Sequence, residues 1–228
     1  MEDGERLAIP IESARVAAAV QLFSRMPSVA RSEGALVRLA KAMPEFDIAS
    51  TLVKVAAVNQ IYATNLYAVY RMAERIAEVY ANTPEWTYAT VDKVAALPAA
   101  QNQKRSRRHL SFASKFAHFF VDRSRFPLLD RHALRAVGFH LSRQLFPGDV
   151  IPSYEAFARE VVRMREEAGL DCSLSEFDKY LWLLGQWLAM QLQSTKTAQL
   201  GSEVSSMFLR ASGADRELVE KFTGGLRA

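Results

Sequence analysis

Lys115 and Asp130 are the residues whose types and placement are best suited to catalysis. Lys115 lies on the aromatic-rich segment SFASKFAHFF, where Lys115 and His118 share one helical stripe. Another stripe of the same segment is apolar and consists of Phe112, Phe116, Phe119 and Phe120. We therefore expect a helix that buries its phenylalanines and turns the lysine toward a polar environment.

Asp130 follows in the segment FPLLD, where Pro127 disfavours helix for the residue before it and Asp130 can cap a helix that begins at about Arg131. A fixed carboxylate can stabilise developing positive charge and orient water, and a neutral lysine amine can attack an electrophilic carbon. Two structural interpretations compete with this chemistry. Asp130 can be a plain N-cap, and Lys115 can be a surface lysine whose stem covers the phenylalanines.

The elements that must position these residues are helices, because alternating patterns are scarce and short. The segment 48–80 has few helix breakers, but polar and aromatic residues interrupt its apolar pattern near 59–64, where we expect a break. Asp47 is the expected N-cap of that segment, and Ser173 with Glu176 forms an expected capping box. The expected helices span residues 11–26, 34–43, 48–80 with its break, 91–97, 133–145, 153–168, 177–192, 201–210 and 214–222. The fold class is therefore all-α.

Composition limits the class of protein. With 228 residues, of which 50% are apolar, the chain can bury a large core as one domain or two interlocked lobes. A single cysteine, Cys172, excludes an internal disulfide, and no Cys/His cluster has zinc spacing, so we expect no metal and a reducing compartment. The N-terminus lacks a basic region followed by an apolar run, and no apolar stretch is long enough to cross a membrane. These features predict a cytoplasmic protein.

The basic residues are concentrated around the Lys115–Asp130 region. Residues 104–143 contain ten Lys/Arg and two Asp, a local charge of +8 in a chain of net charge +4. Such an excess predicts binding to a polyanion such as DNA, although a solvated basic loop is the alternative. The expected contacts to the DNA backbone are Lys104, Arg105, Arg107, Arg108, His109, Arg131 and His132.

This central stretch resembles the helix-hairpin-helix DNA glycosylases, in which a lysine-bearing helix precedes a segment with the catalytic aspartate at a helix start. The matching residues here are Lys115 and Asp130. Residues 58–64 resemble the segment beside the base pocket of that superfamily. Asp178 and Trp182 resemble the acid and tryptophan that contact the flipped base in archaeal enzymes of the AGOG type.

The resemblance implies two helical lobes with a cleft between them, lobe one covering about 48–150 and lobe two 1–47 plus 151–228. It also implies a base pocket, because the base must leave the duplex to be reached. Trp182 and Asp178 have alternative roles as a core residue and a first-turn acid, and His118 is also compatible with simple packing. The expected pocket residues are Gln60, Asn59, Tyr62, Asp178, Trp182 and His118.

One feature departs from the superfamily pattern. The glycine-rich hairpin before the lysine is replaced by RRHLSF, which contains no glycine. Such divergence suits members of the superfamily associated with phage defence, which remove hypermodified cytosines. The resemblance thus predicts a monomeric, cofactor-free enzyme that removes a modified base from duplex DNA. A non-catalytic helical DNA-binding protein and a helical protein-interaction module are the alternatives.

Overall fold

The structure is a computed structural model that describes residues 7–83, 85–98, 107–142, 151, 153–192 and 202–226. Regular structure within these residues is almost entirely helical, which confirms the predicted all-α class. The exception is one antiparallel pair of two-residue strands, β1 (Ala96–Leu97) and β2 (Arg107–Arg108). Among the helices of the described residues, none is long and apolar enough to cross a membrane.

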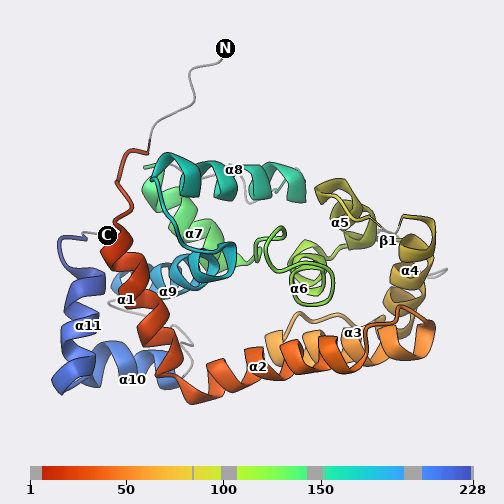
Figure 1. The fold of residues 1–228 in the computed structure, drawn as a ribbon, viewed down its shortest axis with the longest axis horizontal. Coiled ribbons are helices and arrows are strands. Elements are labelled where there is room, and N and C mark those ends of the chain that lie inside the picture. Colours follow the sequence, from red (N-terminus) through yellow and green to blue (C-terminus); the bar gives the residue numbers. More distant parts are fainter. Residues whose placement is uncertain are drawn as a thin grey trace, which may run out of the picture. The chain divides into compact units, whose positions relative to one another are not determined.

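The helices are labelled in chain order in Figure 1. They are α1 (Ser13–Ser24), α2 (Pro27–Ala42), α3 (Ile48–Tyr62), α4 (Val69–Asn82), α5 (Tyr88–Ala95), α6 (Leu110–Phe120), α7 (Arg131–His140), α8 (Tyr154–Glu167), α9 (Leu174–Leu192), α10 (Ser202–Arg210) and α11 (Gly213–Thr223).

The chain divides into two compact units, each assembled from separate stretches of sequence. Unit 1 comprises Met1–Arg31, Asp130–Val150 and Glu160–Ala228, and unit 2 comprises Ser32–Leu129 and Ile151–Arg159. These bounds differ from the expected lobes, because residues 32–47 and 151–159 belong to unit 2, while residues 130–150, which include Asp130, belong to unit 1. The limits at 31/32 and 159/160 fall within α2 and α8, and the limit at 129/130 falls directly before the N-cap of α7.

Unit 1 is built on α9, against which α1 and α7 pack, while α11 packs on α1. The α7–α9 contact is very close at Gly185, where a Cβ atom would lie 2.0 Å from the carbonyl oxygen of His132. His140 anchors the N-terminal segment in this unit, because its ring nitrogens lie 2.8 Å from the Ile9 carbonyl oxygen and 2.8 Å from the Tyr180 hydroxyl. Burial lowers the pKa of His140 to about 4, so the ring is neutral near pH 7.

Unit 2 is built on α6, against which α3 and α5 pack, while α4 packs on α3 and α5. The expected apolar stripe of α6 is buried, with Phe116 at its centre. Rings of Phe46, Trp86 and Phe120 surround Phe116, at centroid distances of 6.2, 6.3 and 5.1 Å. Aromatic rings therefore surround the centre of α6, within a core that also contains aliphatic residues of α3, α4 and α5.

Local sequence signals account for most helix ends. The backbone N–H groups of Ala49 and Ser50 donate to Asp47, and Ser173 and Glu176 form the reciprocal bonds of a capping box, as expected. The expected break of the long apolar segment is confirmed between α3 and α4. The second helix, however, begins at Pro27 rather than at residue 34, because proline is well suited to the first turn of a helix.

Candidate functional site

Lys115 is buried on α6. Its side chain is only 3% exposed, so the interpretation as a surface lysine is wrong. The amine donates to the Ser111 hydroxyl at 2.8 Å, to the Ser111 carbonyl at 3.3 Å and to the Leu129 carbonyl at 3.0 Å. The expected polar environment of the lysine is thus provided by its own helix and by the residue that directly precedes Asp130.

Tyr62 covers the same amine. Lys115 Nζ lies 5.3 Å from the centroid of the Tyr62 ring, within the range of a cation–π contact, and the ring also packs against Phe119 at 5.8 Å. Tyr62 is the last residue of α3. Tyr62, one of the expected pocket residues, is therefore in contact with the lysine.

The segment that leads from α6 to Asp130 is held by buried side chains. Ser114 accepts a hydrogen bond from the backbone N–H of Leu129 at 3.0 Å, and the Tyr154 hydroxyl donates to the Pro127 carbonyl at 2.8 Å. His118 Nδ1 lies 2.8 Å from the Phe126 carbonyl oxygen, which can only accept, so this nitrogen carries the proton. His118 was expected to bind the base, and the structure gives it this positioning role in the connection.

Asp130 is the N-cap of α7, as expected. Its Oδ1 atom accepts hydrogen bonds from the backbone N–H groups of His132 at 2.8 Å and Ala133 at 2.9 Å. These bonds hold the carboxylate at the positive end of the helix dipole, where negative charge is favoured. The capping role is compatible with the proposed catalytic role, because a fixed carboxylate can cap a helix and can also stabilise positive charge.

Asn59 and Gln60, the two other expected pocket residues of α3, differ in their surroundings. The Asn59 side-chain amide forms hydrogen bonds with the loop that follows α3. Its Oδ1 accepts from the Leu66 N–H at 2.9 Å and from the Thr64 hydroxyl at 2.8 Å, while its Nδ2 donates to the Leu66 carbonyl at 3.0 Å. Gln60 is exposed. Asn59 therefore shapes the loop, a role that the sequence analysis missed.

Asp178 and Trp182 lie on α9 of unit 1. Asp178 is buried, with 3% of its surface exposed, so the alternative of an exposed first-turn acid is wrong. Trp182 is partly exposed and packs edge-on against Phe23, with ring centroids 5.8 Å apart. That packing agrees with the alternative in which the tryptophan supports the core of its unit.

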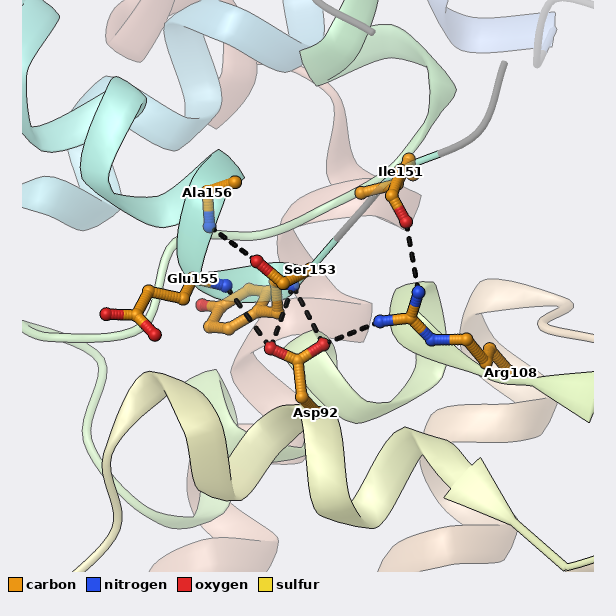
Figure 2. Close-up of polar contacts among 7 residues, drawn as sticks. Asp92, Arg108, Ile151, Ser153, Glu155 and Ala156 are labelled. Atoms are coloured by element: carbon orange, nitrogen blue, oxygen red, sulfur yellow. Dashed lines mark hydrogen bonds and ion pairs between the residues drawn. The ribbon is translucent and has the colours of Figure 1, made fainter. Parts of the chain in front are cut away.

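Asp92, which sequence analysis did not single out, organises part of the basic region (Figure 2). Its carboxylate accepts from the backbone N–H of Tyr154 at 2.9 and 3.0 Å and from Glu155 at 3.4 Å, and so caps α8. Arg108 donates to the same carboxylate at 2.8 Å and to the Ile151 carbonyl at 3.1 Å. No local signal could have indicated this cluster, because its members come from distant parts of the sequence.

Several cations of the 104–143 stretch interact with groups of the same chain. Arg123 forms an ion pair with Glu33, Arg125 donates to the Trp86 carbonyl, and Arg135 donates to the Gly185 carbonyl. The charge that these residues present to a ligand is therefore smaller than the +8 counted in the sequence, because Glu33 and Asp92 compensate part of it.

The structure describes some of the remaining expected DNA contacts in full and others in part or not at all. Lys104 and Arg105 lie outside the described residues, and Arg107 is described only as backbone of β2. The His109 backbone N–H donates to the Ala95 carbonyl at 2.9 Å. Arg131 is exposed, and its Nε lies 3.3 Å from His132 Nε2. Burial lowers the pKa of His132. Arg131 is thus the expected contact best placed to meet a solvent-borne anion.

A further buried lysine, Lys54, was also missed. It lies on α3, its amine donates to the Glu45 carbonyl, and it sits 4.0 Å from the centroid of the Phe46 ring. Burial lowers the pKa of Lys54 below its ordinary value. In the part of the chain that the structure describes, no group of three His, Cys, Asp or Glu residues is arranged to hold a metal ion.

Comparison with known proteins gives one partial match. A family model described as HI_0787_N, N-terminal domain, matches residues 15–124, slightly less than half of the chain. The matched stretch includes Lys115 and ends before Asp130. No curated protein and no solved structure matches the chain.

Proposed function

We propose that the protein is a DNA glycosylase that hydrolyses the bond between a modified base and its deoxyribose, with Asp130 and Lys115 as the central residues. One observation carries this proposal. The buried Lys115 amine is hydrogen-bonded to the carbonyl of Leu129, and the next residue in the chain is the carboxylate-bearing cap of α7. The amine thus binds the residue that directly precedes the carboxylate in the chain, so variants at the two positions can be tested together.

Asp130 supplies the hydrolytic part of the reaction. Cleavage of an N-glycosidic bond develops positive charge on C1′ and O4′ of the sugar, as in other glycoside hydrolyses. A carboxylate that is fixed by helix capping can stabilise this charge and orient the attacking water. The water oxygen bonds to C1′, its proton passes to the departing base, and an abasic site remains.

Lys115 offers a second route, in which the neutral amine attacks C1′ and displaces the base. The resulting Schiff base permits strand cleavage at the abasic site. For this attack the amine must exchange its bonds to Ser111 and Leu129 for contact with the sugar. Tyr62, at 5.3 Å from the amine, is the side chain that covers it in the present arrangement.

The substrate class follows from the proposed reaction. The protein would take a base flipped out of duplex DNA, with hypermodified cytosine of phage DNA as the first candidate and oxidised purines as the second. Exposed Arg131 and the basic stretch around Arg108 would contact phosphates. We expect a monomer that acts in the cytoplasm without a cofactor.

One observation favours a second candidate, a helical DNA-binding protein without activity. Lys115 and Asp130 both have structural roles, because the amine binds three acceptors and the carboxylate caps a helix. The two candidates share DNA binding and differ in chemistry, so activity separates them.

The test incubates the protein with genomic DNAs that contain unmodified cytosine, hypermodified cytosine or oxidised purines, and counts abasic sites with an aldehyde-reactive probe. Asp130→Asn preserves a capping oxygen while removing the charge, so it should retain the fold and DNA affinity and lose at least about a hundredfold in rate, as is usual when an electrostatic catalyst is removed. Wild-type activity in Asp130→Asn would contradict the role of Asp130.

Borohydride reduction tests Lys115 separately. A covalent adduct with DNA that contains abasic sites should form with the wild type and disappear in Lys115→Gln, which retains a hydrogen-bond donor. DNA binding without abasic sites on any of the three DNAs would favour the non-catalytic candidate. Absence of DNA binding would contradict both candidates and favour a protein-interaction module.

A further inference from the structure

Tyr154 is a fully buried tyrosine whose hydroxyl group takes no part in the proposed reaction. It is the first residue of α8 and is 0% exposed, so it cannot touch DNA. Its ring lies edge-on to Tyr88, with centroids 5.8 Å apart, and packs against Phe157 at 6.4 Å. A phenylalanine ring would fill this space equally well, without the cost of burying a polar group. Packing alone therefore does not account for the hydroxyl.

The hydroxyl holds the connection that leads from α6 to α7. It donates to the Pro127 carbonyl at 2.8 Å, across 27 positions of sequence. Proline has no backbone N–H, so its carbonyl is the backbone polar group through which another part of the chain can hold this residue. Pro127 is buried and lies shortly before Asp130 in the chain. The bond thus fixes the backbone that leads to the proposed catalytic carboxylate.

Two helices hold this connection. Three side chains of α6 bind the backbone of Phe126 and Leu129, and Tyr154 of α8 binds Pro127 between them. All of these residues belong to unit 2. Consecutive Cα atoms are about 3.8 Å apart, so a shift of the backbone at Leu129 passes directly to Asp130.

The start of α8 is itself fixed, so the hydroxyl has a rigid support (Figure 2). Asp92 accepts from the backbone N–H groups of Tyr154 at 2.9 and 3.0 Å and of Glu155 at 3.4 Å. The Ser153 hydroxyl accepts from the Ala156 N–H at 3.1 Å. Such caps satisfy the N–H groups of a helix start and hold its first turn. The position of Tyr154 is therefore determined independently of the connection that it holds.

We propose that Tyr154 is a positioning residue, whose hydroxyl holds the Asp130 carboxylate in the geometry that the proposed reaction requires. The inference rests on the proposed function. Asp130 must meet both the sugar and the attacking water, and a displacement of about 1 Å can cost a factor of about 100 in rate. The hydroxyl acts through the backbone of Pro127 and takes no part in the chemistry itself.

Tyr154→Phe removes the hydroxyl and retains the ring. The test uses protein in excess over the genomic DNA on which the wild type forms abasic sites fastest. The maximal rate should fall at least about tenfold. The protein concentration that gives half of this rate should stay within about twofold of the wild-type value, because buried Tyr154 makes no contact with DNA. An unchanged maximal rate would overturn the proposal.

Tyr88→Phe is the matched control. Tyr88 belongs to the same aromatic cluster, with its ring 5.8 Å from that of Tyr154 and 6.0 Å from that of Phe126. Within the described part of the chain, its hydroxyl forms no hydrogen bond. The maximal rate of Tyr88→Phe should therefore stay within about twofold of the wild-type value. Equal losses in the two variants would overturn the proposal, because they would not depend on the bond to Pro127.

Amide hydrogen exchange reports on the Asp130 cap without any reaction. The N–H groups of His132 and Ala133 donate to Asp130 Oδ1, so their exchange shows how firmly the carboxylate is held. Exchange of residues 126–133 should be at least about threefold faster in Tyr154→Phe than in the wild type, because bonds that open more often exchange faster. Tyr88→Phe should exchange as the wild type does. Unchanged exchange in Tyr154→Phe would overturn the proposal.

The outcomes separate this inference from the proposed reaction. If the wild type forms no abasic sites on any DNA, the glycosylase proposal fails, and the positioning role fails with it even where exchange is faster. If the wild type and Tyr154→Phe are equally active, the glycosylase proposal stands and the positioning role alone fails. Faster exchange together with a lower maximal rate supports both.

Discussion

The Lys115 amine donates a hydrogen bond of 3.0 Å to the carbonyl oxygen of Leu129, and the backbone N–H of Leu129 donates to Ser114 at 3.0 Å. Two consecutive residues of α6 therefore hold both polar groups of the residue before Asp130. A substitution of Lys115 therefore removes a hydrogen bond to the segment that leads to Asp130, in addition to any chemistry of the amine. Stability and activity have to be measured together at this position.

Lys115→Ala should lower the free energy of unfolding by about 2–4 kcal/mol, because it removes buried hydrogen bonds and leaves a cavity. Lys115→Met retains most of the volume and should lose less, about 1–2 kcal/mol. Urea denaturation followed by circular dichroism measures both values. A loss below about 0.5 kcal/mol in Lys115→Ala would contradict the structural role of the amine.

Asp92 and Arg108 should contribute different amounts to the free energy of unfolding, although they form one ion pair (Figure 2). Their side chains are 21% and 41% exposed, so the pair itself is worth at most about 1 kcal/mol. Asp92→Ala also uncaps α8 and should lose about 2 kcal/mol, whereas Arg108→Ala should lose about 1 kcal/mol or less. A double-mutant cycle by urea denaturation checks this, and equal losses in the two variants would argue against the cap.

His140 should make unit 1 less stable in mild acid. Its pKa is lowered to about 4 by burial, against an ordinary value of 6.5, so the folded state binds fewer protons than the unfolded state between these values. The stabilising contribution is complete above pH 6.5 and is lost as the pH falls toward 4, a change of about 3 kcal/mol.

Unfolding free energies measured from pH 7 to pH 4 for the wild type and His140→Gln test this expectation. The variant has no group that titrates at this position, so its curve should fall less steeply than that of the wild type. Parallel curves would show that the other ionisable groups alone determine the acid response.

Gly185 and Gly34 provide a matched pair of glycine substitutions. Gly185→Ala would place a Cβ atom 2.0 Å from the backbone oxygen of His132, so α7 and α9 must move apart, with an expected loss of about 3 kcal/mol or more. At Gly34 the nearest atom to a Cβ is Arg38 Nη1 at 3.5 Å, and Gly34→Ala should gain about 0.5–1 kcal/mol from helix propensity. Thermal unfolding of the two variants should therefore shift in opposite directions.

The sequence by itself determined the class and many boundaries of the fold. The caps at Asp47, Asp130 and Ser173, the break after Tyr62 and the buried phenylalanine stripe of α6 were all predictable. These features depend on residues a few positions apart, whose contacts follow from the geometry of one helix turn. Helix limits that differ from the expectation include those of α2, which begins at Pro27, where no apolar periodicity marks the first turn, and of α7, which ends at His140 rather than at residue 145.

Only the tertiary structure decided which polar side chains meet. Asp92 accepts from Tyr154 across 62 positions of sequence, Arg123 reaches Glu33 across 90, and Lys115 reaches Leu129 across 14. A count of charges treats such cations as equally available to a ligand, although the fold pairs several of them internally. Ion pairs and buried hydrogen bonds form wherever packing brings donors to acceptors, and packing between distant segments has no signature in local spacing.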